Sequence, residues 1–243
     1  MKVILFIFAC VFFAPQVTAQ YVVDWKNAPL NPNPVIYTLN HLNISGPVKM
    51  YEKIILPSVS DTFILNEKGR ITVFSASVHS YDNKGLLITI KTKSGSRTFT
   101  NSKDGFIKSD QWNISGQIYN YGYEYNEKGL YIKKIDLDNN NALLEKFDYD
   151  TNQRVVKQES WRAGKIIKTI TYTYSKEDDF LKVIKKSTTD DAPAVETIYF
   201  DSRGNNYGAN KNLKVVNDSH GNRLHFLNPK SKEMVKQQKF SYH

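Results

Sequence analysis

The sequence predicts an all-β protein in which an antiparallel meander of repeated β-hairpins forms a strongly curved or folded-over sheet. Two observations lead to this fold class. A short turn motif recurs along the chain, and the segments between its copies alternate apolar and polar side chains with the period of two typical of β-strands. Beyond residue 19, no segment shows the spacing of an amphipathic helix.

Residues 1–19 have the pattern of a secretory signal peptide. Lys2 supplies the positive start, an apolar run covers residues 3–13, and Val17, Thr18 and Ala19 place small residues at the expected cleavage site. The apolar run of about eleven residues is shorter than the roughly 20 that cross a bilayer as a helix. We therefore expect no transmembrane segment in the mature chain.

The single cysteine, Cys10, lies inside this apolar run. Cleavage then leaves a mature chain with no disulfide, no thiolate metal site and no cysteine nucleophile. An exported chain without cysteine is more typical of a bacterial envelope than of disulfide-rich secreted animal proteins. We expect an exported protein of the periplasm, the cell surface or the extracellular medium.

Residues 20–45 differ in composition from the rest of the chain. Pro29, Pro32 and Pro34 stand among asparagines, which favours an extended lead-in. The segment around Trp25 is a candidate to fill one end of the curved sheet. The β-hairpin repeat domain is expected to cover residues 46–243.

The turn motif consists of an apolar, usually aromatic, residue, then Asn or Asp, two polar residues and Gly. Its clearest copies lie at residues 65–71, 81–87 and 125–131, with looser copies around Gly105, Gly204 and Gly221. Asn or Asp opens a type I turn, and Gly takes the left-handed conformation that closes a short hairpin loop. The residues assigned to these turns are Asn66, Gly69, Asp82, Gly85, Gly105, Asn126, Gly129, Asp201, Gly204 and Gly221.

Two further copies keep the aromatic residue but lack the glycine. They begin at Tyr149 and Tyr172, with Gln153 and Asp179 at the glycine positions, and Asn152 is the residue expected in the left-handed conformation. The copies are roughly 16 to 26 residues apart, which suits one two-stranded unit per repeat and about 14 to 16 strands in all. Second turns are expected at residues 94–95, 115–116, 139–141, 163–164 and 191–193.

Tyrosines concentrate on one side of the predicted strands. Tyr119, Tyr121, Tyr123 and Tyr125 alternate with polar residues and glycine, so they share one face of a strand. Two interpretations stay open. These rings pack against neighbouring strands, or they form a platform on which sugars or bases stack.

The copies at residues 81–86, 125–130 and 199–205 resemble the YD repeats of the RHS class. The segment from Ile44 to Lys49, which leads to the first turn, resembles the start of short YD-like arrays in exported bacterial proteins. The likeness covers about residues 46–243, and two of the turn glycines are missing from it. The resemblance implies a scaffold or binding surface rather than a reaction, and the chain is too short for the toxin-enclosing shell of larger RHS proteins.

The motifs of common catalytic and metal sites do not emerge from the sequence. Residues 148–159 have the oxygen-ligand spacing of a calcium loop, but Gln153 replaces the glycine that its sharp turn needs. His220 and His225 flank a turn without a third ligand nearby. We expect no enzyme activity, no metal and no cofactor, although the sequence leaves open a carboxylate pair facing a cleft.

The formal net charge of +9 favours anionic partners, yet the lysines are dispersed rather than clustered. The first hypothesis is a non-enzymatic binding or scaffold module at the bacterial envelope, with a protein or an anionic polysaccharide as partner and no nucleic acid. The alternative is an immunity or inhibitor protein that neutralises an exported toxin. The ligand-binding residues and the oligomeric state stay undetermined at this stage.

Overall fold

The computed structural model describes residue 28 and residues 30–32, 46–55, 59–189, 193–228, 230 and 234–243. The expected signal peptide, Trp25 and most of the lead-in lie outside the described residues, as do two residues of the turn expected at 191–193.

The described part of the chain is all-β and contains no helix. Its 18 strands belong to one antiparallel sheet, so the predicted fold class is confirmed. The strands are β1 (Val48–Ile55), β2 (Val59–Leu65), β3 (Ile71–Phe74), β4 (Ser77–Tyr81), β5 (Leu87–Thr92), β6 (Gly95–Asn101), β7 (Ile107–Ile114), β8 (Gln117–Tyr125), β9 (Tyr131–Asp136), β10 (Ala142–Tyr149), β11 (Val155–Arg162), β12 (Lys165–Glu177), β13 (Phe180–Thr189), β14 (Ala194–Phe200), β15 (Asn206–Gly208), β16 (Lys214–Asn217), β17 (Arg223–Leu227) and β18 (Met234–Tyr242).

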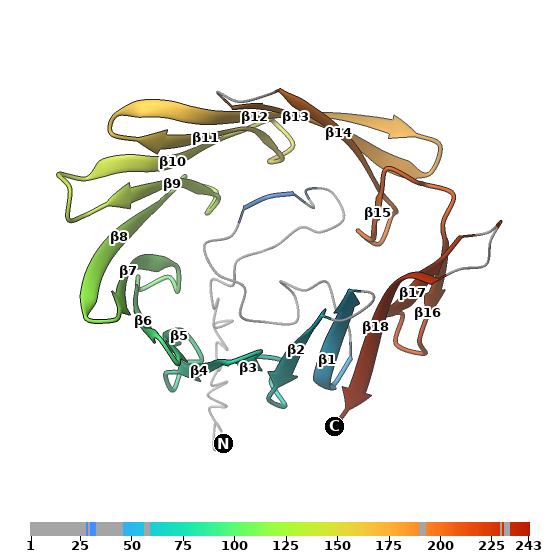
Figure 1. Cartoon of the computed structure of the whole chain (residues 1–243), viewed down its shortest axis with the longest axis horizontal. Coiled ribbons are helices and arrows are strands. Elements are labelled where there is room, and N and C mark those ends of the chain that lie inside the picture. Colours follow the sequence, from blue (N-terminus) through green and yellow to red (C-terminus); the bar gives the residue numbers. More distant parts are fainter. Residues whose placement is uncertain are drawn as a thin grey trace, which may run out of the picture.

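The sheet is a meander that bends round until its first and last strands meet (Figure 1). Each strand from β1 to β14 pairs with the next, and β16, β17 and β18 form a second such run. The strand β18 then pairs with β1, with Tyr51 opposite Phe240. Within the described residues no registered pair joins β15 to β16, so the sheet stays open at that point.

The turns that close on a glycine share two hydrogen bonds: the glycine amide donates to the carbonyl of the first turn residue, and the next amide donates to the side chain of that first residue. In the copy at Asn126, the Gly129 amide donates to the Asn126 carbonyl at 2.9 Å, and the Asn126 side chain accepts from the amides of Lys128 and Leu130. Ser102 takes the place of Asn or Asp in the copy that ends at Gly105. A polar side chain that binds nearby backbone amides stabilises the loop without help from the sheet, which is why the motif is readable from sequence.

A tyrosine of the motif links several repeats to the repeat before them. In four cases its hydroxyl donates to a backbone carbonyl that lies two residues after the preceding glycine position, at 2.5 to 2.9 Å. The pairs are Tyr81 to Ile71, Tyr125 to Ile107, Tyr149 to Tyr131 and Tyr174 to Val155. The aromatic residue of the motif is therefore explained by contact between repeats rather than by the turn.

Two of the expected turns differ from the sequence expectations. Gln153, not Asn152, has the positive φ, at 62°, because its amide closes the loop on the Asp150 carbonyl as glycine does elsewhere. The copy expected at Tyr172 lies inside β12. Its hairpin turns at residues 178–179, where Asp178 has a φ of 54° and residues 177 and 180 pair. Two residues are enough to close this hairpin, so β12 continues through the expected motif as far as Glu177.

The strand count also exceeds the expectation. Ser75, with a φ of 49°, makes a tight turn between β3 and β4 that carries no Gly, Pro, Asn or Asp. Gly95 belongs to β6 rather than to the expected turn, because Thr92 pairs with it directly. A turn without typical turn residues cannot be recognised from sequence, so the hairpin of β3 and β4 around Ser75 was not expected.

The apolar face lies on the inside of the curved sheet, here called the inner face. Its largest core cluster is centred on Leu87, Phe99, Ile107 and Val155, and Leu30 of the lead-in packs against it. The side-chain Nδ2 of Asn31 donates to the Gln153 carbonyl at 2.7 Å, and its side-chain oxygen accepts from the Val155 backbone amide at 2.9 Å. Residues 30–32 therefore lie within the bend of the sheet, beside β11 (Figure 1).

Candidate functional site

A pocket of about 720 Å³ opens over the strands β2 to β7. Arg97 lines it and lies two residues from Phe99 in β6, so both side chains project from the same face of the strand. Phe99 belongs to the core cluster that Leu30 covers, which places the pocket on the inner face. The volume is in the range of small-molecule sites, about 300–1,000 Å³.

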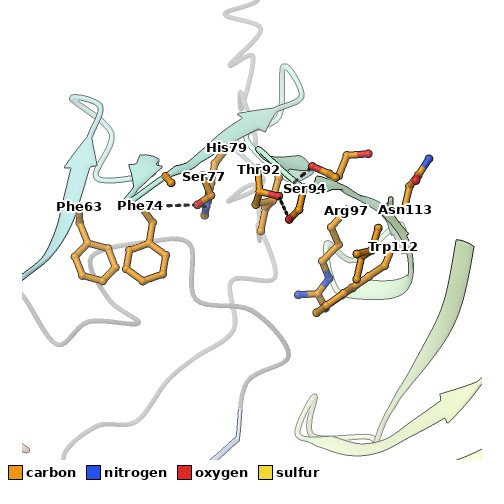
Figure 2. A pocket seen from close by; sticks show the side chains of 14 residues that line it. Phe63, Phe74, Ser77, His79, Thr92, Ser94, Arg97, Trp112 and Asn113 are labelled. Atoms are coloured by element: carbon orange, nitrogen blue, oxygen red, sulfur yellow. Dashed lines mark hydrogen bonds between the residues drawn. The ribbon is translucent and has the colours of Figure 1, made fainter. Parts of the chain in front are cut away.

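The walls of the pocket are aromatic on two sides (Figure 2). Phe63 and Phe74 stand on one side and Arg97 and Trp112 on the other, all four pointing to the same side of the sheet. Phe63 and Phe74 are stacked, with ring centroids 4.5 Å apart. The stack continues through Tyr51, which lies against Phe63 at 5.2 Å, so packing across three strands holds this wall rigid.

A buried carboxylate fixes the opposite wall. The Asp110 side chain is fully buried and accepts from Arg97 Nε, from Trp112 Nε1 at 2.6 Å and from the Tyr123 hydroxyl at 3.0 Å. Arg97 Nη2 donates to the same hydroxyl at 2.8 Å. A buried carboxylate with three donors is well compensated, and it holds the guanidinium and the indole in one arrangement.

The guanidinium of Arg97 also packs between two rings. Its central carbon lies 4.7 Å from the Phe99 ring centroid and 4.8 Å from that of Trp112. The Arg97 side chain keeps 17% of its surface exposed, unlike its carboxylate partner. Arg97 lines the pocket, so cation–π contacts as well as the ion pair hold its guanidinium at the pocket wall.

His79 and Ser77 form the floor between the two walls. The Ser77 hydroxyl donates to the Phe74 carbonyl at 2.8 Å, so its oxygen accepts from His79 Nε2 at 3.2 Å. Nδ1 is then the unprotonated nitrogen, and it has no partner among the described residues. Burial lowers the pKa of His79 from 6.5 to about 4, so the imidazole is neutral near pH 7.

This serine–histidine pair is not arranged as a nucleophile and its base. The hydroxyl proton is committed to a backbone carbonyl, and no carboxylate of the described residues orients the second ring nitrogen. A histidine with so low a pKa is also a weak base at neutral pH.

A second cation lies beside the pocket on the inner face. The Lys134 ammonium sits 4.0 Å from the Tyr121 ring centroid, and Tyr121 meets Trp112 edge-on at 6.1 Å. Burial lowers the pKa of Lys134 from its ordinary value. The aromatic surface around Trp112 thus has a cation on either side.

Sequence reasoning missed these residues because pairing between strands brings them together. Arg97 in β6 lies opposite Ile90 of β5 on one side and opposite Trp112 of β7 on the other. Each pairing is set by the turn that joins the two strands. The signal that could have found them is the turn at Gly105, from which pairs can be counted outward along β6 and β7.

The residues assigned to turns lie where hairpins close and not in the pocket. Gly69, Gly85, Gly105, Gly129, Gly204 and Gly221 have φ between 68° and 84°. The side chains of Asn66, Asp82, Asn126 and Asp201 accept hydrogen bonds from backbone amides of their own loops.

The residues weighed for calcium and metal binding are placed separately. Asp150 accepts from the Arg154 amide within its own turn, and Glu159 pairs with Lys157 at 2.5 Å. His220 stacks on Tyr242, and His225 lies in β17. Across the described ranges, no three His, Cys, Asp or Glu side chains gather as a potential metal site.

Comparison with known proteins yields remote structural likenesses. No protein-family model matches the sequence, and no curated protein matches it. A porin-like protein from Bacteroides uniformis is 12% identical, with a TM-score of 0.41 over 82% of this chain and 98% of its own. A porin-like protein from Bacteroides vulgatus is also 12% identical, with a TM-score of 0.37 over 81% of this chain and 98% of its own.

A solved structure of TcdB2-TccC3-TEV is 9% identical, with a TM-score of 0.28 over 78% of this chain and 13% of its own. The described residues include no helix long and apolar enough to cross a membrane. The function proposed below rests on this chain's own residues.

Proposed function

We propose that this chain is an exported, non-enzymatic binding module of the bacterial envelope, and that the inner-face pocket is its binding site. The observation that carries the proposal is the fixed pair of Arg97 and Trp112. A buried carboxylate holds both side chains, and both line a pocket of suitable volume.

Preorganisation is the physical reason to connect this arrangement with binding. A guanidinium that is already immobilised loses little conformational freedom when a ligand arrives, so more of the contact energy appears as affinity. Burying Asp110 is costly unless its partners stay in place. A sheet that needed only stability could use apolar side chains at these positions, which supports a role in recognition.

The repeat supports a scaffold without catalysis. Turns closed by their own side chains, and tyrosines that bind the preceding repeat, give a sheet whose inner face is held rigidly. We propose that the array is a short YD/RHS-like one, and the leader pattern of residues 1–19 supports export.

Retention of envelope components on the purified chain tests the function. Ala76 is exposed in the β3–β4 turn and lines the pocket, so Ala76→Trp fills the opening without touching the core. Ser202→Trp is the matched control in an exposed turn that does not line the pocket.

The parent and Ser202→Trp should retain the same components at moderate salt, and Ala76→Trp should lose them. Retention of nothing by the parent at low and at moderate salt contradicts a binding module. Equal retention by all three proteins would mean that the binding site lies outside the pocket.

A further inference from the structure

We propose that the pocket recognises an acidic saccharide, with the carboxylate of a sugar on Arg97 and the sugar ring between the aromatic walls. The inference rests on the proposed function and specifies its ligand. Two features of the pocket carry it, a fixed guanidinium edge and two facing aromatic walls, and a polar floor supports it.

The guanidinium offers donors for a carboxylate. Of the five N–H groups of Arg97, one binds Asp110 and one binds Tyr123. The three that remain are on Nη1 and Nη2, and one N–H from each of these nitrogens forms the planar fork that matches two carboxylate oxygens. Stacking on Trp112 keeps that plane from rotating.

The aromatic walls suit a ring with apolar faces. Phe74 and Trp112 stand on opposite sides of the pocket (Figure 2). A pyranose presents C–H groups on its faces and hydroxyls around its edge, so its faces pack against aromatic rings while its edge stays polar. Small polar residues at the opening, such as Thr92 and Ser94, are placed to meet that edge.

The floor of the pocket favours a ligand that carries hydroxyl groups. His79 is only 7% exposed, and its Nδ1 carries a lone pair without a partner among the described residues. This nitrogen has almost no solvent-accessible surface, so a ligand hydroxyl binds it only if the side chains around it shift. That bond would add to affinity, because a buried acceptor without a partner is unfavourable. A simple aliphatic or aromatic acid has a carboxylate but no such hydroxyl, whereas a sugar acid has both.

Isothermal titration calorimetry with digalacturonic acid tests the proposal on the full mature chain. Its neutral dimethyl ester controls for the carboxylate, and benzoate controls for an apolar acid without hydroxyls. The parent should bind digalacturonic acid at least about tenfold more tightly than the ester, since one charge-assisted hydrogen bond contributes about that factor.

A charge placed at the opening tests the site without disturbing the fold. Removing Arg97 leaves the buried Asp110 carboxylate without its counter-charge, so that variant is unsuitable on its own. Ser94→Asp adds a negative charge at an exposed pocket residue, and Ser202→Asp adds the same charge to an exposed turn away from the pocket. Ser94→Asp should weaken digalacturonic acid binding by about fivefold at low salt, and less at high salt, while Ser202→Asp binds like the parent.

Three other outcomes would each reject the acidic saccharide as the ligand. Equal binding of the acid and its ester removes the role of the carboxylate, and binding of benzoate alone makes the ligand an apolar acid. Both leave the proposed function standing. No binding of any probe, together with pocket-dependent retention of envelope components, rejects the saccharide alone, and the absence of both rejects the binding module as well.

Discussion

Gly129→Val measures how much the fold depends on the turn motif. Gly129 has a φ of 76°, and an added Cβ would lie 2.9 Å from Phe106 Cζ. A β-branched residue in that conformation is strained by about 1–3 kcal/mol. The Phe106 ring, 4.9 Å from Tyr125, must also shift, which adds about 0.5–1.5 kcal/mol. We expect a loss of about 2–4 kcal/mol in the free energy of unfolding.

Gly116→Val separates the two contributions. Gly116 has a φ of 85°, but nothing lies within 4 Å of its would-be Cβ. It should therefore lose only the backbone strain, about 1–3 kcal/mol. Urea unfolding followed by circular dichroism gives both values, provided that the slope with denaturant is unchanged.

The comparison between the two variants decides the outcome. If both variants lose the same free energy of unfolding, the Phe106 ring moves aside without cost and does not pack tightly against Gly129. If Gly129→Val unfolds at the same urea concentration as the parent, the left-handed glycine has no role and the hairpin-repeat account is wrong.

Four further changes have expected outcomes. Gln153→Gly should be neutral or stabilise by up to about 1 kcal/mol in urea unfolding, because relief of left-handed strain exceeds the added chain entropy. Tyr125→Phe should cost about 1 kcal/mol in the same assay, because the Ile107 carbonyl loses its donor. Asn31→Ala should cost about 1–3 kcal/mol in thermal unfolding, since two backbone groups lose their partner. His79→Gln should flatten the dependence of stability on pH.

The sign of the last effect follows from the lowered pKa of His79. Its folded value of about 4 lies below the ordinary 6.5, so the unfolded chain binds the proton more readily between these values. The parent should lose stability as the pH falls from about 6.5 to 4, by at most about 3 kcal/mol, at roughly 1.4 kcal/mol for each pKa unit. Parallel pH curves for the parent and His79→Gln would contradict a neutral, buried imidazole.

A matched control variant is available for each of the other three substitutions, Gln153→Gly, Tyr125→Phe and Asn31→Ala. Asn152→Gly changes the neighbouring loop residue, which lacks a positive φ, and should not stabilise the chain. Tyr119→Phe removes a hydroxyl bonded to the exposed Gln117, and should cost less than Tyr125→Phe. Asn139→Ala, in an exposed turn where the contact to Ala142 is through the backbone carbonyl, should cost less than Asn31→Ala.

The repeat could be predicted from sequence because its turns are local. A polar side chain and a glycine three residues later fix each loop through contacts within a few residues, as at Asn126 and Gly129. The same logic fails where the turn has no signature, as at Ser75, or where a two-residue loop suffices, as at Asp178.

The closure of the sheet and the pocket depend on contacts between distant residues. The pairing of β1 with β18 joins segments almost the whole chain apart, and no local pattern encodes it. The pocket is assembled from side chains of β2 to β7, so Arg97 and Trp112 become neighbours only through the strand register. The alternating tyrosines could be recognised in the sequence, but the position of Arg97 beside Trp112 could not.

Methyl NMR tests most directly whether the inner face is where this chain binds its ligand. Ile90 and Ile114 line the pocket, whereas Ile118 and Ile166 are exposed elsewhere. On addition of digalacturonic acid to protein labelled at isoleucine methyl groups, the signals of Ile90 and Ile114 should shift while those of Ile118 and Ile166 stay in place. Shifts confined to Ile118 or Ile166 would contradict the account.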